Sequence, residues 1–204
     1  GCTMMISISR ISEGLTEKIK TAFPDIDKQK AETIEYGIYM AISEVIKIVL
    51  IILISIILKI TKYVVVTIPL FGMLRLYIGG IHADTHIKCF ITTALTMLSI
   101  PLFCINIRMN NLILAAAAFP FCLIAIYKYA PADNPNKPVK SKKQRKALRI
   151  KGFILITLYF AISIFLPYKW ANIIICTSII ACVMTTPALY RLYGNKYSYE
   201  EVKS

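Results

Sequence analysis

The chain has 204 residues, of which 57% are hydrophobic and only 17% charged, and its mean hydropathy is +0.64. A soluble domain is about 45–50% apolar and about 25% charged, so this composition excludes a soluble globular enzyme, a disordered regulator and a secreted disulfide scaffold. The net charge of +13 is concentrated in short stretches between apolar segments, which indicates membrane topology and contact with anionic lipids rather than nucleic-acid binding. We therefore expect an integral membrane protein.

The N-terminal region has the pattern of an amphipathic helix over residues 4–23. Its apolar side chains recur at helical spacing: Ile8, Ile11, Leu15, Ile19 and Ala22. Such a helix either lies in the membrane interface or packs on the protein's own cytoplasmic face, and the pattern favours neither. Pro24 ends it.

Six apolar segments follow, and each predicts a transmembrane helix. They cover residues 45–58, in the second half of a helix expected over 28–60, and then 63–74, 90–107, 112–129, 153–166 and 171–189. A span needs about 20 residues, so the segment 63–74 must either continue through 75–78 or be re-entrant. The predicted fold is all-α: one integral membrane domain over residues 1–204, with about six transmembrane helices over 28–190.

Basic residues orient the predicted spans. Eight lysines and arginines, and no acidic residue, lie between Lys137 and Lys151, and such clusters mark cytoplasmic connections. We therefore expect a basic cytoplasmic loop over residues 130–151, with both termini and the connection 75–89 on the same side. Lys59 and Lys62 would lie on the outer side and are a mild exception to the rule that basic residues gather on the cytoplasmic side.

The connection at residues 75–89 is the most polar stretch next to a predicted span. It contains both histidines of the chain, His82 and His86, together with the thiol of Cys89. A cysteine with a nearby histidine is sufficient for acyl transfer, because the imidazole takes the thiol proton and returns it to a leaving amine. The alternatives are a chance meeting of these residues at the interface, or a metal site. Two histidines and one cysteine are fewer ligands than a structural zinc site uses, so we expect no metal.

Spacing alone does not decide which histidine is the general base for the thiol. On a straight helix His82 and Cys89 would be about 10 Å apart, whereas His86 and Cys89 would be neighbours. A break in the backbone before His82 would remove this constraint, and Gly79-Gly80 can supply one. A helix that begins after the break would carry Cys89 in its early turns. The four cysteines inside apolar runs are expected to pack as small apolar groups: Cys104, Cys122, Cys176 and Cys182.

One string resembles the signature of the accessory gene regulator B (AgrB) family: Arg75-x-x-x-Gly79-Gly80-x-His82-Ala83-x-Thr85-x-x-x-Cys89. Members of this family are bacterial membrane endopeptidases that process the AgrD pro-peptide in quorum sensing. A second landmark of the family resembles the stretch Ala130-Pro131-Ala132-Asp133-Asn134-Pro135-Asn136-Lys137-Pro138, which a basic run follows. Length, six spans and the amphipathic start also match, so the resemblance covers nearly the whole chain.

The resemblance implies a role for individual residues. Cys89 would be the nucleophile and His82 the general base, which resolves the choice between the two histidines. Arg75, Gly79 and Gly80 match positions that support the site, and Lys137 occupies a position suited to contacting an acidic tail of the substrate. The candidate oxyanion donors are backbone N–H groups near Gly80 or at a helix start.

The implied activity is that of a cysteine endopeptidase without a cofactor, in the bacterial cell membrane, with its site toward the cytoplasm. It would cleave the C-terminal tail from an AgrD-like pro-peptide through a Cys89 acyl-enzyme and promote closure of a thiolactone or lactone. The resemblance further implies a homodimer. Besides the pro-peptide, the expected partners are membrane lipids, and no nucleic acid is expected.

Two other classes of function compete with this prediction. A small membrane peptide transporter without covalent chemistry would suit the bundle and its positive cytoplasmic face. Its spans, however, carry almost no charge near their centres, where transport pathways usually have ionisable groups. A non-enzymatic adaptor that uses the basic loop is the third class, and dependence on a thiol separates the enzyme from both.

Overall fold

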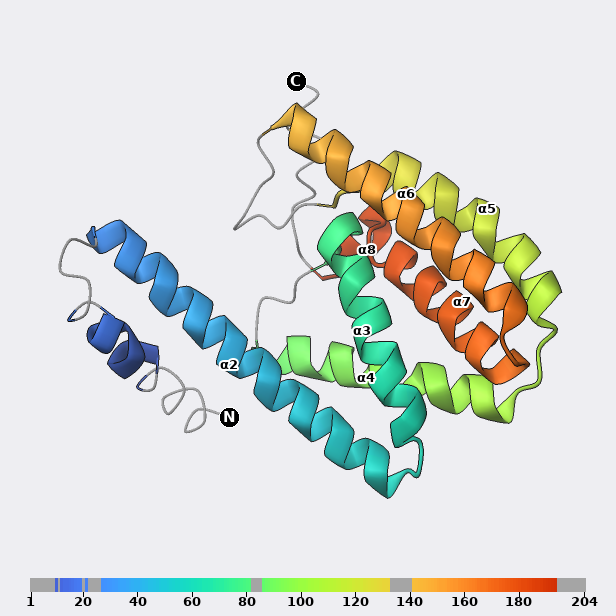
Figure 1. Ribbon diagram of the computed structural model, residues 1–204, viewed down its shortest axis with the longest axis horizontal. Coiled ribbons are helices and arrows are strands. Elements are labelled where there is room, and N and C mark those ends of the chain that lie inside the picture. The colour runs from blue at the N-terminus through green and yellow to red at the C-terminus, as the bar shows by residue number, and fades with distance from the viewer. Residues whose placement is uncertain are drawn as a thin grey trace. The chain divides into compact units, whose positions relative to one another are not determined.

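The computed structural model of the protein describes residues 12–19, 27–81, 86–132 and 141–193, together with Arg10 and Thr21. In these residues the chain is helical almost throughout and forms no β-strand, so the predicted all-α fold class is confirmed (Figure 1). Residues 12–19 form a helix within the amphipathic segment predicted at 4–23; apart from Arg10 and Thr21, the rest of that segment lies outside the described residues. The helices that follow are α2 (Lys28–Ile57), α3 (Thr61–Ile78), α4 (His86–Asn106), α5 (Asn111–Tyr129), α6 (Lys142–Phe165), α7 (Tyr168–Val183) and α8 (Pro187–Leu192). The last of these, α8, is short.

Within the described ranges, five helices are long and apolar enough to cross a membrane: α2 from Lys30 onward, α3, α4, α5 and α6. A sixth, α7, is apolar but has only 16 residues. Each of these six helices overlaps one of the six predicted segments, and together they make the chain a multi-pass membrane protein. The short segment at 63–74 continues as one helix through Ile78, so α3 has 18 residues and the re-entrant alternative is wrong.

Two helix boundaries differ from the predicted ones. The helix α6 begins at Lys142, so residues 142–151 of the expected basic loop form the first turns of a helix, as good helix formers such as lysine and arginine allow. The last predicted segment, 171–189, divides into α7 and α8. Pro187 explains this division, because proline lacks an N–H donor and keeps the residue before it out of the helical conformation. That residue, Thr186, has φ −76° and ψ 144°.

The chain divides into two units, residues 1–54 and 55–204. In the first unit, the hydroxyl of Thr16 is buried and donates to the carbonyl of Ser12 at 2.8 Å. Further along, Lys47 is almost fully buried and forms an ion pair with Glu44, three residues earlier on α2, with an N–O distance of 2.6 Å. This pair neutralises the charges at the start of the apolar half of α2.

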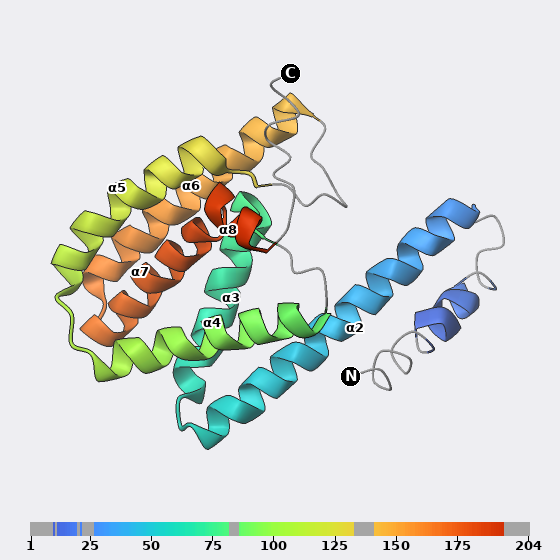
Figure 2. The same cartoon turned by 180° about the vertical axis from the view of Figure 1, so that it is seen from behind.

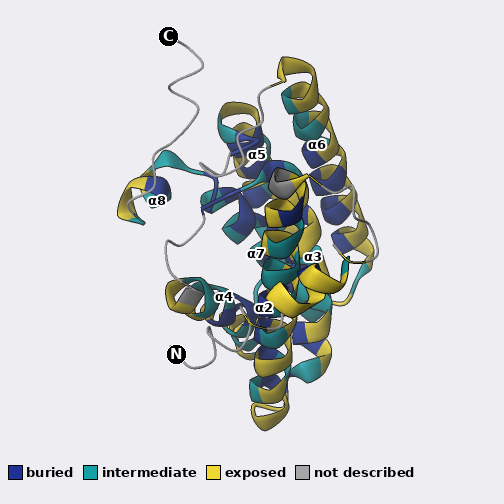
Figure 3. Ribbon diagram, turned by 90° about the vertical axis from the view of Figure 1, so that its left-hand side faces the viewer, coloured by how far each residue is buried: buried dark blue, intermediate teal, exposed yellow. Residues whose placement is uncertain are grey.

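The helix α7 is central to the second unit. It contacts α3, α4, α5 and α6, and opposite views show it lying among them (Figures 1 and 2). Its buried residues point in all directions around the axis: Ala171, Asn172, Ile173, Ile174, Ile175, Thr177, Ser178, Ala181 and Cys182. Many are small, which lets neighbouring helices approach closely. The helix α6, by contrast, is buried along one side and exposes apolar residues such as Ile154 and Leu158 along the other (Figure 3).

Hydrogen bonds to backbone carbonyls connect the central helices to their neighbours. The side-chain amide of Asn172 on α7 donates to the carbonyl of Met109, between α4 and α5, at 3.2 Å. The hydroxyl of Tyr159 on α6 donates to the carbonyl of Leu70 on α3, also at 3.2 Å. These two bonds help to fix how the helices lie along one another.

Two glycines give a test of the packing between α3 and α6. A Cβ on Gly152 would lie 2.8 Å from Cγ2 of Ile78, a fully buried side chain, whereas a Cβ on Gly72 would have nothing within 4 Å. Replacing glycine by alanine inside a helix otherwise gains about 0.5–1 kcal/mol. We therefore expect Gly72→Ala to raise the Tm in detergent and Gly152→Ala to lower it. A rise in Tm for both variants would contradict the close packing of these two helices.

Candidate active site

The predicted site residues that the structure describes lie at helix ends. Arg75 is in the last turn of α3, and Gly79 and Gly80 follow directly after that helix. Cys89 is the fourth residue of α4, where its thiol is half-buried. Outside the described residues lie His82 and Lys137, and also the side chain of His86.

The helix α3 ends at two glycines whose backbone conformations other residues avoid. Gly79 has a φ of 73° and Gly80 a φ of 140°, and this range is readily accessible only to glycine. The N–H of Gly79 still donates to the carbonyl of Arg75 at 3.0 Å and so completes the last turn. The predicted break after α3 is confirmed, and residues 82–85, on which the separation between His82 and Cys89 depends, lie outside the described residues.

The residues after α3 pair with those after α5, so the two motifs singled out in the sequence meet in the fold. The N–H of Ala132 donates to the carbonyl of Ile78 at 2.9 Å, and the N–H of Gly80 donates to the carbonyl of Ala132 at 3.3 Å. These bonds form a short parallel bridge between Gly79 and Ala132. A Cβ on Gly79 would overlap the carbonyl oxygen of Ala132, so this contact requires glycine.

The guanidinium of Arg75 holds the chain immediately before residue 82. Its Nη2 donates to the carbonyl of Ile81 at 2.6 Å, and its Nη1 lies 3.6 Å from Sδ of Met184. The N–H of Ile81 donates to the carbonyl of Met184 at 3.1 Å. Both backbone groups of Ile81 are therefore bonded, and a Cβ on Gly80 would come within 2.8 Å of the guanidinium.

Two residues that sequence reasoning missed complete this junction. Met184 follows α7 and provides the carbonyl for Ile81, and no local pattern marks it for this role. Arg149 on α6 donates from Nε to the carbonyl of Ala130 at 2.8 Å; in the sequence it is only one of the eight basic residues between Lys137 and Lys151. The ends of α3, α5 and α7 and the first half of α6 thus meet at one end of the bundle, with α8 beside the end of α3 (Figures 1 and 2).

Cys89 lies one turn before a threonine that contacts the C-terminal part of the chain. The hydroxyl of Thr92 donates to the carbonyl of Lys88 at 2.8 Å and lies 3.0 Å from the hydroxyl of Tyr193. Residues three apart on a helix are neighbours on its surface. The side of α4 that carries Cys89 therefore also carries the contact with Tyr193.

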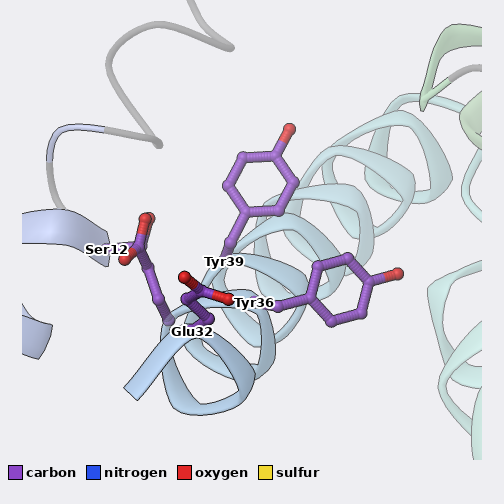
Figure 4. A pocket seen from close by; sticks show the side chains of 5 residues that line it. Ser12, Glu32, Tyr36 and Tyr39 are labelled. Carbon is purple, nitrogen blue, oxygen red and sulfur yellow. The ribbon is translucent and has the colours of Figure 1, made fainter. Parts of the chain in front are cut away.

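A pocket of about 250 Å³ lies in the first unit and contains none of the predicted site residues. It is lined by Ser12, Glu32, Glu35, Tyr36 and Tyr39 (Figure 4). In the part of the chain that the structure describes, no three histidine, cysteine, aspartate or glutamate residues lie close enough together to hold a metal ion. Cys104, Cys122 and Cys182 are buried, as expected of small apolar groups, and Cys176 is half-buried.

The fold and the junction define an α-helical, multi-pass membrane protein with a thiol at one end of its bundle. The model of the accessory gene regulator B family matches residues 12–186, and the chain belongs to this family. It is 25% identical to AgrB-like protein 2 of Clostridium perfringens strain 13 over 169 residues, which cover 77% of this chain and 76% of that protein. It is also 25% identical to an AgrB-like protein of Listeria monocytogenes EGD-e over 177 residues, or 86% of each chain. No solved structure matches the chain.

Family membership gives the protein a role in the agr quorum-sensing system. The family is linked to peptide processing, and its partner is an AgrD-type pro-peptide.

The pairing of Gly79 with Ala132 leads to a prediction. Gly79→Ala places an L side chain at positive φ, which costs roughly 1–2 kcal/mol, and pushes the Ala132 carbonyl away. We expect pro-peptide processing by reconstituted protein to fall about tenfold or more, because a misplacement of about 1 Å near a site can lower a rate by roughly 100-fold. Gly37→Ala, on α2 with nothing within 4 Å of the new Cβ, is the control. Normal processing by Gly79→Ala would show that the peptide chemistry does not depend on this junction.

Proposed function

We propose that the protein is a membrane-embedded cysteine endopeptidase that removes the C-terminal tail of an AgrD-type pro-peptide and promotes its closure to a thiolactone or lactone. The observation that carries the proposal is the position of Cys89. Its half-buried thiol is in the first turn of α4. The segment before α4 follows Ile81, whose two backbone groups are bonded to Arg75 and Met184.

The chemistry follows from a cysteine and a histidine. His82 takes the proton of the Cys89 thiol, and the sulfur attacks the carbonyl of the scissile peptide bond. When the C–N bond breaks, the protonated imidazole returns the proton to the amine of the leaving tail. The remaining acyl group is a thioester on Cys89. A thiol or hydroxyl of the substrate then attacks this thioester, closes the ring and releases the Cys89 thiol.

The junction after α3 supports His82 as the base. Gly79 and Gly80 end α3, and residue 82 follows them in the stretch that connects α3 to the first described residue of α4. Both backbone groups of Ile81 are bonded, so the point from which this connection starts is fixed. A general base must be held in place, because a small displacement of it strongly lowers the rates of proton transfer and nucleophilic attack.

The same hydrogen bonds narrow the choice of oxyanion donors. The N–H groups of Gly79, Gly80 and Ile81 already donate to the carbonyls of Arg75, Ala132 and Met184, respectively. They are therefore poor candidates for binding the oxyanion. The other predicted candidates, backbone N–H groups at a helix start, stay a prediction.

The first turns of α6 are suited to bind an acidic tail of the substrate. The exposed cations Lys142, Lys143 and Lys146 lie there, with no acidic residue in the first turn. One turn after Lys146, Arg149 is bonded to the junction through the Ala130 carbonyl. Lys151 lies 5.9 Å from the ring centre of Tyr77, in the last turns of α3. The basic surface is thus continuous with the end of the bundle at which the junction forms.

The proposed chemistry is tested by intact-mass spectrometry of reconstituted protein mixed with its pro-peptide. The wild type should release the tail and carry an acyl adduct on Cys89. Cys89→Ala and His82→Ala should do neither, whereas His86→Ala should retain both. Cleavage by Cys89→Ala would overturn the thiol mechanism, and loss of activity only in His86→Ala would reverse the assignment of the base.

A second prediction concerns the tail. Neutralising Lys142, Lys143 and Lys146 together by glutamine should raise the KM for the pro-peptide about tenfold at low salt and leave kcat unchanged, as exposed ion pairs contribute roughly 0.2–1 kcal/mol each. The difference from wild type should shrink toward 1 M salt, where the Debye length falls to about 3 Å.

The matched control for this variant neutralises cations away from the junction: Lys62→Gln, at the start of α3, with Lys169→Gln, at the start of α7. It should keep the wild-type KM. An equal rise in KM in the control would contradict a specific role for α6.

A further inference from the structure

The segment from Met184 to Tyr193 contacts a residue near each member of the proposed catalytic pair. At its start, the carbonyl of Met184 accepts from the N–H of Ile81, the residue before His82. At its end, the hydroxyl of Tyr193 contacts Thr92, three residues after Cys89. One short stretch of chain therefore touches the connection that carries the base and the helix that carries the nucleophile.

The direction of the bond between Tyr193 and Thr92 follows from a count of hydrogens. A threonine hydroxyl has one hydrogen and two lone pairs. The hydrogen of Thr92 is donated to the carbonyl of Lys88 at 2.8 Å. Tyr193 must therefore be the donor in the 3.0 Å contact, and the Thr92 oxygen the acceptor. The bond consequently joins Tyr193 to a hydroxyl that is itself held against the first turn of α4.

The segment between these two contacts is well anchored. Pro187 begins α8 with a fixed φ, and Tyr190 in its middle is only 1% exposed. The N–H of Tyr190 donates to the carbonyl of Thr186 at 3.3 Å, and the N–H of Tyr193 to the carbonyl of Leu189 at 3.0 Å. Because the turn is buried and hydrogen-bonded, its two ends are held at a fixed position relative to each other.

We propose that Tyr193 is a positioning residue for Cys89. Together with the Met184 carbonyl, it fixes the first turns of α4 relative to Ile81, the residue before the proposed base. This inference rests on the proposed function, in which His82 and Cys89 act together. Tyr193 itself takes no part in bond making or bond breaking.

The kinetic consequence is a change in turnover with substrate binding preserved. Tyr193→Phe keeps the ring and removes the donor, so kcat should fall about fivefold, as expected for the loss of one ordinary hydrogen bond. The KM should stay within about twofold of wild type, because the basic turns of α6 are unchanged. Thr92→Val should behave like Tyr193→Phe, and Thr92→Ser, which keeps the acceptor, should restore wild-type turnover. Tyr127→Phe, which removes an exposed hydroxyl on α5, is the control.

A second readout does not depend on the pro-peptide. Alkylation of Cys89 by iodoacetamide, followed by peptide mapping to separate it from the other cysteines, reports how the thiol is activated at each pH. Tyr193→Phe should slow alkylation near neutral pH and move the pH profile toward that of His82→Ala. In a His82→Ala background, Tyr193→Phe should have no further effect, because the alignment it maintains has lost its partner.

The outcomes separate the two proposals. If Cys89→Ala still processes the pro-peptide, the proposed function fails, while the alkylation profiles still report on the role of Tyr193. If Cys89 is essential but Tyr193→Phe keeps the wild-type kcat and pH profile, the positioning role is overturned. An equal slowing of alkylation by Tyr193→Phe with and without His82 would also overturn it, since the tyrosine would then act on the thiol independently of the base.

Discussion

The arrangement of the candidate site depends on one backbone contact, the pairing of residues 78–80 with Ala132. The two segments of backbone approach so closely that Gly79 has no room for a side chain. This contact brings the ends of α3 and α5 together, and the N–H of the next residue, Ile81, donates to the carbonyl of Met184. Arg75 then occupies the other side of the glycine pair and bonds the Ile81 carbonyl. The support for the proposed base is thus made largely of backbone groups, which few substitutions other than those at the glycines can alter.

The central helix α7 makes this contact possible. Its small buried side chains let α3 and α5 pack against it at the same level, and the turn that follows it provides the Met184 carbonyl. The first half of α6 adds Arg149, which holds Ala130 from the other side. A basic helix that we propose for tail binding is therefore bonded directly to the junction beside the proposed catalytic connection. Binding and chemistry share a single piece of structure at this end of the bundle.

The sequence predicted what depends on local patterns and missed what depends on distant contacts. Apolar runs predicted the spans, and the glycine pair predicted where α3 ends, because hydropathy and backbone freedom are properties of neighbouring residues. Pro187 was also a local signal, and it would have divided the last segment correctly. The contact of Arg75 with Met184, by contrast, joins residues 109 positions apart, and that of Thr92 with Tyr193 joins residues 101 apart. Their roles follow from packing that no pattern in one chain indicates, and those of His82 and Lys137 stay predictions.

The short length of α7 has a consequence for water. Sixteen residues of helix extend about 24 Å, less than the roughly 30 Å of a hydrocarbon core. Because other helices enclose it, α7 need not match the bilayer, and at least one of its ends stops below the membrane surface. In the proposed reaction, a position of the Met184 end below the surface would keep the junction away from bulk water. A thioester formed there would meet the substrate's own thiol more often than water, which would favour a ring over a hydrolysed linear peptide.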